Sequence, residues 1–229
     1  APITSEAARL VFTNDPQINP EKWVTVDLAD YGKDNLVAFA WNGFHIVDMM
    51  ILTHSTPREN AEKTRIFAQE HGVAESHIIF DGTSGRYFND YIPDAICYYS
   101  SKASFGMYFN QAPTVKDMCY LRFVKMINNG DITMDEKVSS QNYIHQEIHN
   151  SITVGVEFME ECSVVRFKEL PNGGKKLLSK IEMNKKLGRN RSMDVLDPCA
   201  MRMYPCANIP YGEEMQYGFN DAESEEEID

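Results

Sequence analysis

Three aspartates stand where apolar stretches of the chain end: Asp27, Asp81 and Asp197. A carboxylate at the end of a buried run costs free energy unless a cation or hydrogen bonds compensate its charge. Carboxylate oxygens are hard ligands of the kind that Mg²⁺ and Mn²⁺ select. The three residues therefore suggest a divalent-metal site.

Such a site has a defined chemistry. Two divalent ions about 4 Å apart can activate a water molecule and stabilise the leaving oxygen of an in-line phosphoryl displacement. The positive charge of the ions also makes a cluster of aspartates tolerable, and no nucleophilic serine or cysteine is then required.

The first two aspartates have elements that could bring them together. Apolar runs at 22–28, 35–42 and 44–53 predict an antiparallel meander of three strands. A helix is expected to begin at a capping box of Thr56 and Glu59, and the strand 77–80 follows it and leads into Asp81. Strand, helix and strand normally form a right-handed parallel unit, so Asp27 and Asp81 should emerge side by side.

The second half of the chain is expected to be mainly helical. Thr114 and Asp117 open an amphipathic helix that ends at Gly130, and a last helix should run through Met201 and Met203. The intervening part predicts a helical stretch near 140–149, strands at 152–157 and 163–168, and a turn at 171–174. A meander, a parallel fourth strand and an acid on a late helix indicate an α/β, ribonuclease-H-like mixed sheet flanked by helices.

Composition is compatible with one domain. The 229 residues are 43% apolar, which suffices for a core, and no apolar run reaches the roughly 18 residues that a membrane helix needs. We expect residues 1–21 to be a lead-in, 22–212 the domain and 213–229 an acidic, disordered tail. The five cysteines contain no C-x-x-C pair, which favours reduced thiols in a cytosolic protein.

The net charge of −12 is unevenly distributed. Eight acids and no base lie between Glu213 and Asp229, whereas nine bases face two acids between Arg166 and Arg191. The basic run is either a solvated face or, beside a metal site, a surface for DNA phosphates. The residues predicted to bind DNA are Lys175, Lys176, Lys180, Lys185, Lys186, Arg189 and Arg191.

Four segments together resemble one family. They are Asp27-Leu28-Ala29-Asp30-Tyr31-Gly32-Lys33-Asp34, Phe80-Asp81-Gly82-Thr83-Ser84-Gly85, the helix that starts at Lys116, and the stretch from Leu187 to Asp197 ahead of Tyr204. In order and spacing they are similar to the C-terminal nuclease domain of the large terminase subunit of tailed phages or prophages, over about residues 23–204.

The resemblance implies a metal-dependent endonuclease that cuts concatemeric double-stranded viral DNA during packaging, with two Mg²⁺ or Mn²⁺ ions. Carried over by position, Asp27, Asp81 and Asp197 would be catalytic metal ligands, with Asp194 as a fourth acid. The implied partners are DNA, a preceding ATPase motor domain, the portal and the small terminase subunit, with no membrane. The implied location is the cytoplasm of an infected or lysogenic bacterial cell.

Several alternatives stay open at this point. Asp197 precedes Pro198, so it could instead cap its own helix. His145 and His149 are spaced as in a zinc protease, but Gln146 stands where that motif needs its general base. The domain could also be a non-catalytic docking module of the packaging motor, or a related resolvase or ribonuclease on the same fold.

Overall fold

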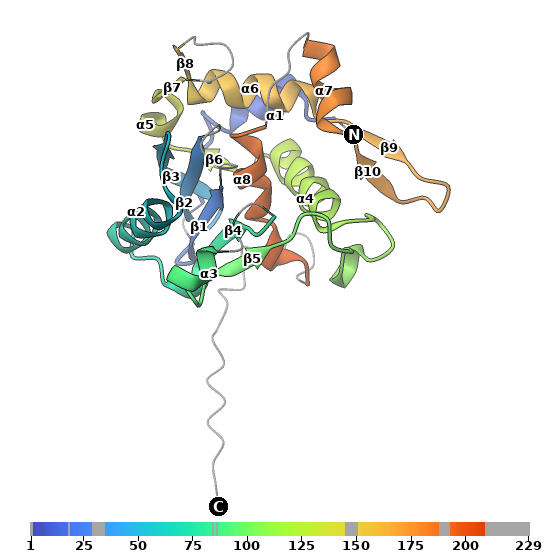
Figure 1. Ribbon diagram of the computed structural model, residues 1–229. Coiled ribbons are helices and arrows are strands. Elements are labelled where there is room, and N and C mark those ends of the chain that lie inside the picture. The colour runs from blue at the N-terminus through green and yellow to red at the C-terminus, as the bar shows by residue number, and fades with distance from the viewer. Residues whose placement is uncertain are drawn as a thin grey trace, which may run out of the picture.

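A computed structural model describes residues 2–17, 19–28, 35–83, 85, 87–144, 151–187 and 193–208. Its centre is a six-stranded mixed sheet with helices on both faces (Figure 1). The strand order is β5-β4-β1-β2-β3-β6. The strands are β1 (Lys22–Asp27), β2 (Leu36–Asn42), β3 (His45–Leu52), β4 (Ile78–Asp81), β5 (Ile96–Tyr98) and β6 (Thr133–Met134).

Strands β1, β2 and β3 form the antiparallel meander that the sequence predicts. Trp23 lies opposite Trp41 in the β1–β2 pair, and the indole of Trp41 donates a 3.0 Å hydrogen bond to Thr25 Oγ1. The turn between β2 and β3 contains Gly43 at φ +61°, a left-handed conformation that glycine adopts without strain. A bulge at Ala40 and Trp41 adjusts the register of β2 against β3.

The predicted crossover is also confirmed. Helix α2 (Pro57–Glu70) begins with the expected capping box, in which Thr56 and Glu59 each bond the other's backbone amide. The chain then enters β4, which pairs with β1 in parallel, with Val26 opposite Phe80. Strand β5 continues the sheet in parallel beyond β4.

The sheet is buried on both faces because the side chains of each strand alternate in direction. One face, with Val24, Val26 and Phe80, packs against α2 and the short helix α3 (Phe88–Tyr91). The other face, with Trp23, Phe39 and Ile79, belongs to a larger core that includes α4 (Val115–Asn129) and α8 (Leu196–Met201). Figure 1 shows α2 on one side of the strands and α4 with α8 on the other.

Helix α4 is capped as expected. Thr114 and Asp117 form a capping box at its start, and Gly130 ends it at φ +77°. A short helix, α5 (Glu136–Ser139), follows β6.

The segment after α5 differs from the prediction. Residues 142–144 of the expected helix form strand β7 (Asn142–Ile144), which pairs with β8 (Ser151–Thr153), and residues 145–150 lie outside the described part. The predicted strand at 152–157 was wrong beyond residue 153, because helix α6 (Val154–Val164) starts there with Thr153 as N-cap. Val154, Phe158 and Cys162 recur every four residues and are buried, which is helical periodicity. The predicted strand at 163–168 was wrong as far as Val164, and β9 (Phe167–Glu169) begins three residues later.

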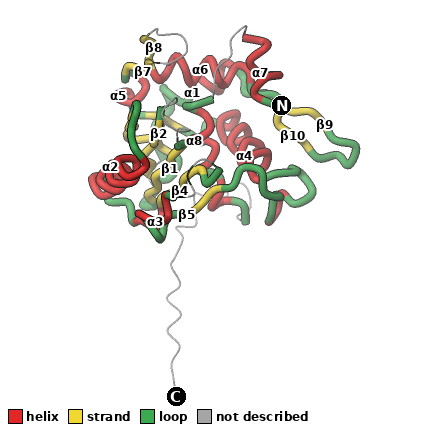
Figure 2. Tube along the Cα trace, viewed as in Figure 1, coloured by secondary structure: helices red, strands yellow, loops and turns green. Residues whose placement is uncertain are grey.

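The remaining elements surround α4 and α6. Helix α1 (Ser5–Leu10), in the segment expected to be a lead-in, buries Ala7 and Ala8 against the core. Strands β9 and β10 (Lys175–Leu177) form a projecting hairpin that leads into helix α7 (Lys180–Leu187), as the tube in Figure 2 shows. Three single turns of 3₁₀ helix complete the described part: Glu75–His77, Gly106–Tyr108 and Tyr204–Cys206. No helix among the described residues is long and apolar enough to span a membrane.

Candidate metal site

Asp27 and Asp81 are the last residues of two adjacent parallel strands. The register that places Val26 opposite Phe80 puts the two aspartates at the same end of the sheet. Asp27 stands four residues after Trp23, and Asp81 stands two residues after Ile79, and both of these side chains lie on the α4 and α8 face. Strand alternation therefore directs the two aspartates to that face. The sequence-based expectation that they emerge side by side is met by this pairing.

Asp197 approaches from helix α8, which packs against both β1 and α4. The hydroxyl of Tyr120 donates a 2.5 Å hydrogen bond to Asp197 Oδ1. Lys116 Nζ lies 2.8 Å from Oδ1 and 2.9 Å from Oδ2, and Lys180 Nζ lies 3.4 Å from Oδ2. Three donors from α4 and α7 therefore hold one carboxylate, of which 13% is exposed.

Asp197 does not cap its own helix. The N-cap position of α8 is Val195, which makes no side-chain cap, and Asp197 lies inside the first turn. The capping acceptor is Glu161 of α6, which accepts hydrogen bonds from the amides of Val195 at 3.3 Å and Leu196 at 2.7 Å. Because Glu161 satisfies these amides, the Asp197 carboxylate is available to face the sheet.

Asp194 lies three residues before Asp197 and is held by a residue of a different element. It is 9% exposed, and Tyr143 of β7 donates a 2.8 Å hydrogen bond to its Oδ2. Burial, followed by the charges of Glu157 and Asp194, raises the pKa of Glu161 well above its usual value. The segment that carries Asp194 and Asp197 is thus anchored by a buried acid that sequence analysis did not identify.

The aspartates influence each other electrostatically. Burial, then the charges of Asp197 and Asp194, raise the pKa of Asp27 well above 3.8, with Asp81 contributing in the same direction. Burial also acts to raise the pKa of Asp197, but Lys116 and Lys180 outweigh it and lower that pKa to about 2. Asp27 is therefore the group at which negative charge is least compensated by the protein itself.

Asp81 is oriented by the loop that follows it. Its Oδ1 accepts a 2.8 Å hydrogen bond from the Thr83 amide, a short turn that fixes the carboxylate. Thr83 Oγ1 in turn lies 3.4 Å from the hydroxyl of Ser100, in the loop after β5.

The donor set suits a hard divalent cation. It offers carboxylate oxygens from two strands and one helix, with an excess of negative charge at Asp27. Across the described ranges, no three acidic, histidine or cysteine side chains already converge closely enough to hold a metal ion. The ammonium groups of Lys116 and Lys180 supply the positive charge next to Asp197 instead.

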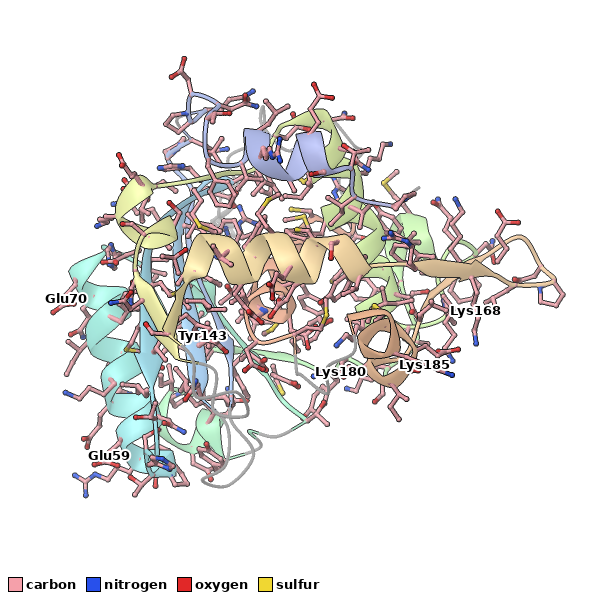
Figure 3. The ribbon with its side chains drawn as sticks, turned by 90° about the horizontal axis from the view of Figure 1, so that it is seen from above. Glu59, Glu70, Tyr143, Lys168, Lys180 and Lys185 are labelled. Atoms are coloured by element: carbon pink, nitrogen blue, oxygen red, sulfur yellow. The ribbon has the colours of Figure 1, made fainter. Side chains whose placement is uncertain are left out.

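The predicted DNA-binding residues separate into different places. Lys176 and Lys180 border a cavity beside Asp197, whereas Lys175 lines a different cavity, of about 460 Å³, between α4 and the hairpin. Figure 3 labels Lys180 and Lys185 on α7, and Lys185 is exposed. The side chains of Lys186, Arg189 and Arg191 lie outside the described part, as do His145 and His149.

Three side chains that hold Asp197 or its helix were not among the predicted site residues: Lys116, Tyr120 and Glu161. Lys116 and Tyr120 are four residues apart on α4, a spacing that places both on one helix face. That spacing could have suggested a shared partner. No local pattern indicates that Glu161 bonds residues 34 and 35 positions further along the chain.

The topology defines a fold class. A meander followed by parallel strands, with helices on both faces, is the ribonuclease-H-like fold, and here aspartates end β1 and β4 and a third lies on the late helix α8. No protein-family profile matches the sequence, and the curated proteins contain no significant match to it.

Comparison with solved structures finds this fold in phage proteins. The nuclease domain of the large terminase subunit gp2 of bacterial virus Sf6 has a TM-score of 0.68 at 16% identity, covering 88% of this chain and 97% of that one. A mutant of the same domain with manganese has a TM-score of 0.66 at 15% identity, with the same coverage of both chains. The large terminase nuclease of thermophilic phage G20c has a TM-score of 0.55 at 9% identity, covering 89% of this chain and 98% of that one. The protein therefore has the fold of phage large terminase nuclease domains.

Proposed function

We propose that this chain is the metal-dependent endonuclease domain of a phage DNA-packaging terminase and that it cuts double-stranded DNA by phosphodiester hydrolysis. The single observation that carries the proposal is the juxtaposition of Asp27 and Asp81 on parallel strands β1 and β4, with Asp197 of α8 on the same face. The likeness to terminase nuclease domains over almost their whole length supports the same reading.

In the proposal, Asp27, Asp81 and Asp197 hold two Mg²⁺ or Mn²⁺ ions, with Asp194 as a further acid. When bound, such ions activate water and stabilise the developing charge at phosphorus and the leaving oxygen. A structural neighbour has been solved with manganese, which supports this choice of ion. The raised pKa of Asp27 supports it as well, because a bound cation would offset the burial and the repulsion from Asp197 and Asp194 that raise this pKa.

The protein residues have separate tasks. Tyr120 fixes the orientation of Asp197 through its hydrogen bond, and Glu161 fixes the start of the helix that carries it. Lys116 and Lys180 neutralise Asp197, and their position beside it suits contacts with a phosphate group. Contacts to phosphates carry no base information, so little sequence preference is expected.

The proposal also includes the packaging context. A preceding ATPase motor domain, the portal and the small terminase subunit are the proposed partners, in the cell of a bacterial host. These partners are proposed from the structural likeness to terminase nuclease domains, and not from any surface of this chain.

The decisive experiment is a supercoiled-plasmid nicking assay with Mn²⁺ or Mg²⁺ and with EDTA as the control. We expect open-circular and linear products only with the metal, and none from Asp27→Asn or Asp81→Asn variants that keep the wild-type circular dichroism spectrum. Full cutting by either variant would refute its assigned role. Failure of the wild type to nick under any metal would favour the docking-module alternative, and preferred cutting of branched DNA or RNA would favour a resolvase or ribonuclease.

A further inference from the structure

A cavity of about 310 Å³ lies directly beside the aspartate cluster. Its walls come from the loop after β5, the start of α4, and the segment that joins β10 to α7. Its polar lining consists mainly of ammonium and hydroxyl groups, contributed by Lys116, Lys176, Lys180, Ser100, Ser101 and Ser179.

The cavity is positively charged. Three lysines line it against a single lining acid, Asp117. The oxygens of Asp117 are already used, because Oδ2 accepts from the Thr114 amide and hydroxyl and Oδ1 accepts from the Leu177 amide. Asp117 therefore serves the local structure, and the lysines determine what the cavity attracts.

Side chains, rather than the end of helix α4, must recognise a ligand here. The amide of Val115 donates to the Lys102 carbonyl at 2.9 Å, and the amide of Lys116 donates to the Ser100 carbonyl at 3.0 Å. The first two amides of α4 thus already donate to carbonyls of the loop after β5 and are not available to a ligand. The lysine ammonium groups and the hydroxyls of Ser100 and Ser101 remain, and both kinds of group donate hydrogen bonds to phosphate oxygens. The Ser179 hydroxyl already donates to Glu182 Oε2 at 2.7 Å.

The cavity is connected to the aspartate cluster on two sides. Lys116 and Lys180, which line it, both have ammonium groups within 3.4 Å of Asp197 oxygens. On the other side, Ser100 contacts Thr83, whose amide holds Asp81. An anion in the cavity would therefore lie next to a phosphate held between Asp81 and Asp197.

We propose that this cavity is a subsite for a DNA backbone phosphate adjacent to the phosphate that is cut, which rests on the proposed nuclease function. Lys176 is the lining lysine that distinguishes this subsite, because Lys116 and Lys180 are paired with Asp197 whereas Lys176 is exposed on the hairpin, with the charge of Glu182 nearby. A strand bound here follows the wall formed by β10 and the start of α7, and the hairpin then guides the DNA towards the aspartates.

The test measures binding of a fluorescent 20-base-pair duplex over a range of salt concentrations, with Ca²⁺ present and the DNA verified as intact. The logarithm of the association constant for DNA falls linearly with the logarithm of the salt concentration. Loss of one phosphate contact makes this slope shallower by about 0.9, which corresponds to roughly eightfold weaker binding at about 0.1 M salt. We expect this change for Lys176→Ala and its recovery in Lys176→Arg.

Two variants make the test specific. Lys63→Ala removes an exposed lysine from α2, on the other face of the sheet, and should bind like the wild type. Lys175 neighbours Lys176 but lines a different cavity, so Lys175→Ala should reduce the slope less than Lys176→Ala. Equal effects at Lys175 and Lys176 would indicate a diffuse basic surface and overturn the subsite.

The nicking assay, run in parallel, separates this inference from the proposed function. If the wild type nicks DNA but Lys176→Ala binds the duplex as the wild type does, the subsite is refuted and the nuclease function stands. If the wild type never nicks DNA but Lys176→Ala alone reduces the salt dependence of binding, the phosphate site stands and the nuclease function is refuted. No measurable binding of the duplex by the wild type would overturn the subsite.

Discussion

The hydroxyl of Tyr120 on α4 donates a 2.5 Å hydrogen bond to Oδ1 of Asp197 on α8. Tyr120 is 1% exposed, and burial followed by the charge of Asp197 raises the pKa of its phenol well above 10. The phenol therefore keeps its proton at every pH at which the protein is expected to work. One carboxylate of the proposed metal site is thus held by a permanent donor from a different element.

Replacement of Tyr120 by phenylalanine should weaken that positioning. We expect the free energy of unfolding to fall by about 1.5 kcal/mol, the typical contribution of a hydrogen bond to a charged group. The nicking rate should fall by about tenfold, because Asp197 gains freedom to turn. Urea denaturation and the plasmid assay measure the two effects. Tyr91→Phe, at a residue that is 39% exposed, is the matched control, and an equal loss of nicking there would contradict the role of Tyr120.

Asp27→Asn should stabilise the metal-free protein. Burial and the neighbouring acids raise the pKa of Asp27, so its ionised form is unfavourable in the folded state at neutral pH. We expect a rise in melting temperature of about 3 °C in EDTA, the size that roughly 1 kcal/mol gives for a chain of this length. Mn²⁺ should raise the melting temperature of the wild type but much less that of the variant, since a ligand stabilises only the state that binds it.

Asp94→Asn serves as the control for this comparison, because Asp94 is exposed on a loop away from the site. It should leave both the melting temperature in EDTA and the Mn²⁺ response unchanged. A lower melting temperature for Asp27→Asn in EDTA would show that the Asp27 charge is compensated in the metal-free protein.

Glu161→Ala should loosen the helix that carries Asp197. A buried amide without an acceptor costs about 1–3 kcal/mol, and two amides, those of Val195 and Leu196, would lose theirs. Relief of the repulsion with Glu157 offsets part of this cost, so we expect a net loss of about 2 kcal/mol and strongly reduced nicking. Glu70→Ala, at an exposed position of α2 labelled in Figure 3, is the control for urea denaturation. An unchanged midpoint for Glu161→Ala would exclude the capping role.

The stability of the fold should decrease on mild acidification because of His45. Burial lowers the pKa of His45, and its Nδ1 lies 2.8 Å from Thr133 Oγ1 between β3 and β6. Below about pH 6.5 the unfolded chain binds a proton at this residue that the folded protein does not, so stability falls as the pH falls. His45→Gln should show a smaller loss of unfolding free energy between about pH 7.5 and 5.5. His54→Asn, at an exposed position, should keep the wild-type dependence.

Local patterns predicted the first half of the fold well. The meander, the Thr56 capping box and the parallel return through β4 follow from short-range turn chemistry and alternation, and all three are present. Helix α6 was missed because β-branched valines at its start resemble a strand, whereas the buried spacing of Val154, Phe158 and Cys162 made it helical.

The sequence by itself determined that Asp27 and Asp81 stand at the same end of two adjacent parallel strands, because a right-handed crossover between the two strands leaves little choice of pairing. Only the tertiary structure decided the state of Asp197. Whether that carboxylate caps its own helix or faces the sheet depends on Glu161, Lys116, Tyr120 and Lys180, which come from three other helices. Such contacts join residues far apart in the chain, and the packing of whole helices, rather than local propensity, sets their geometry.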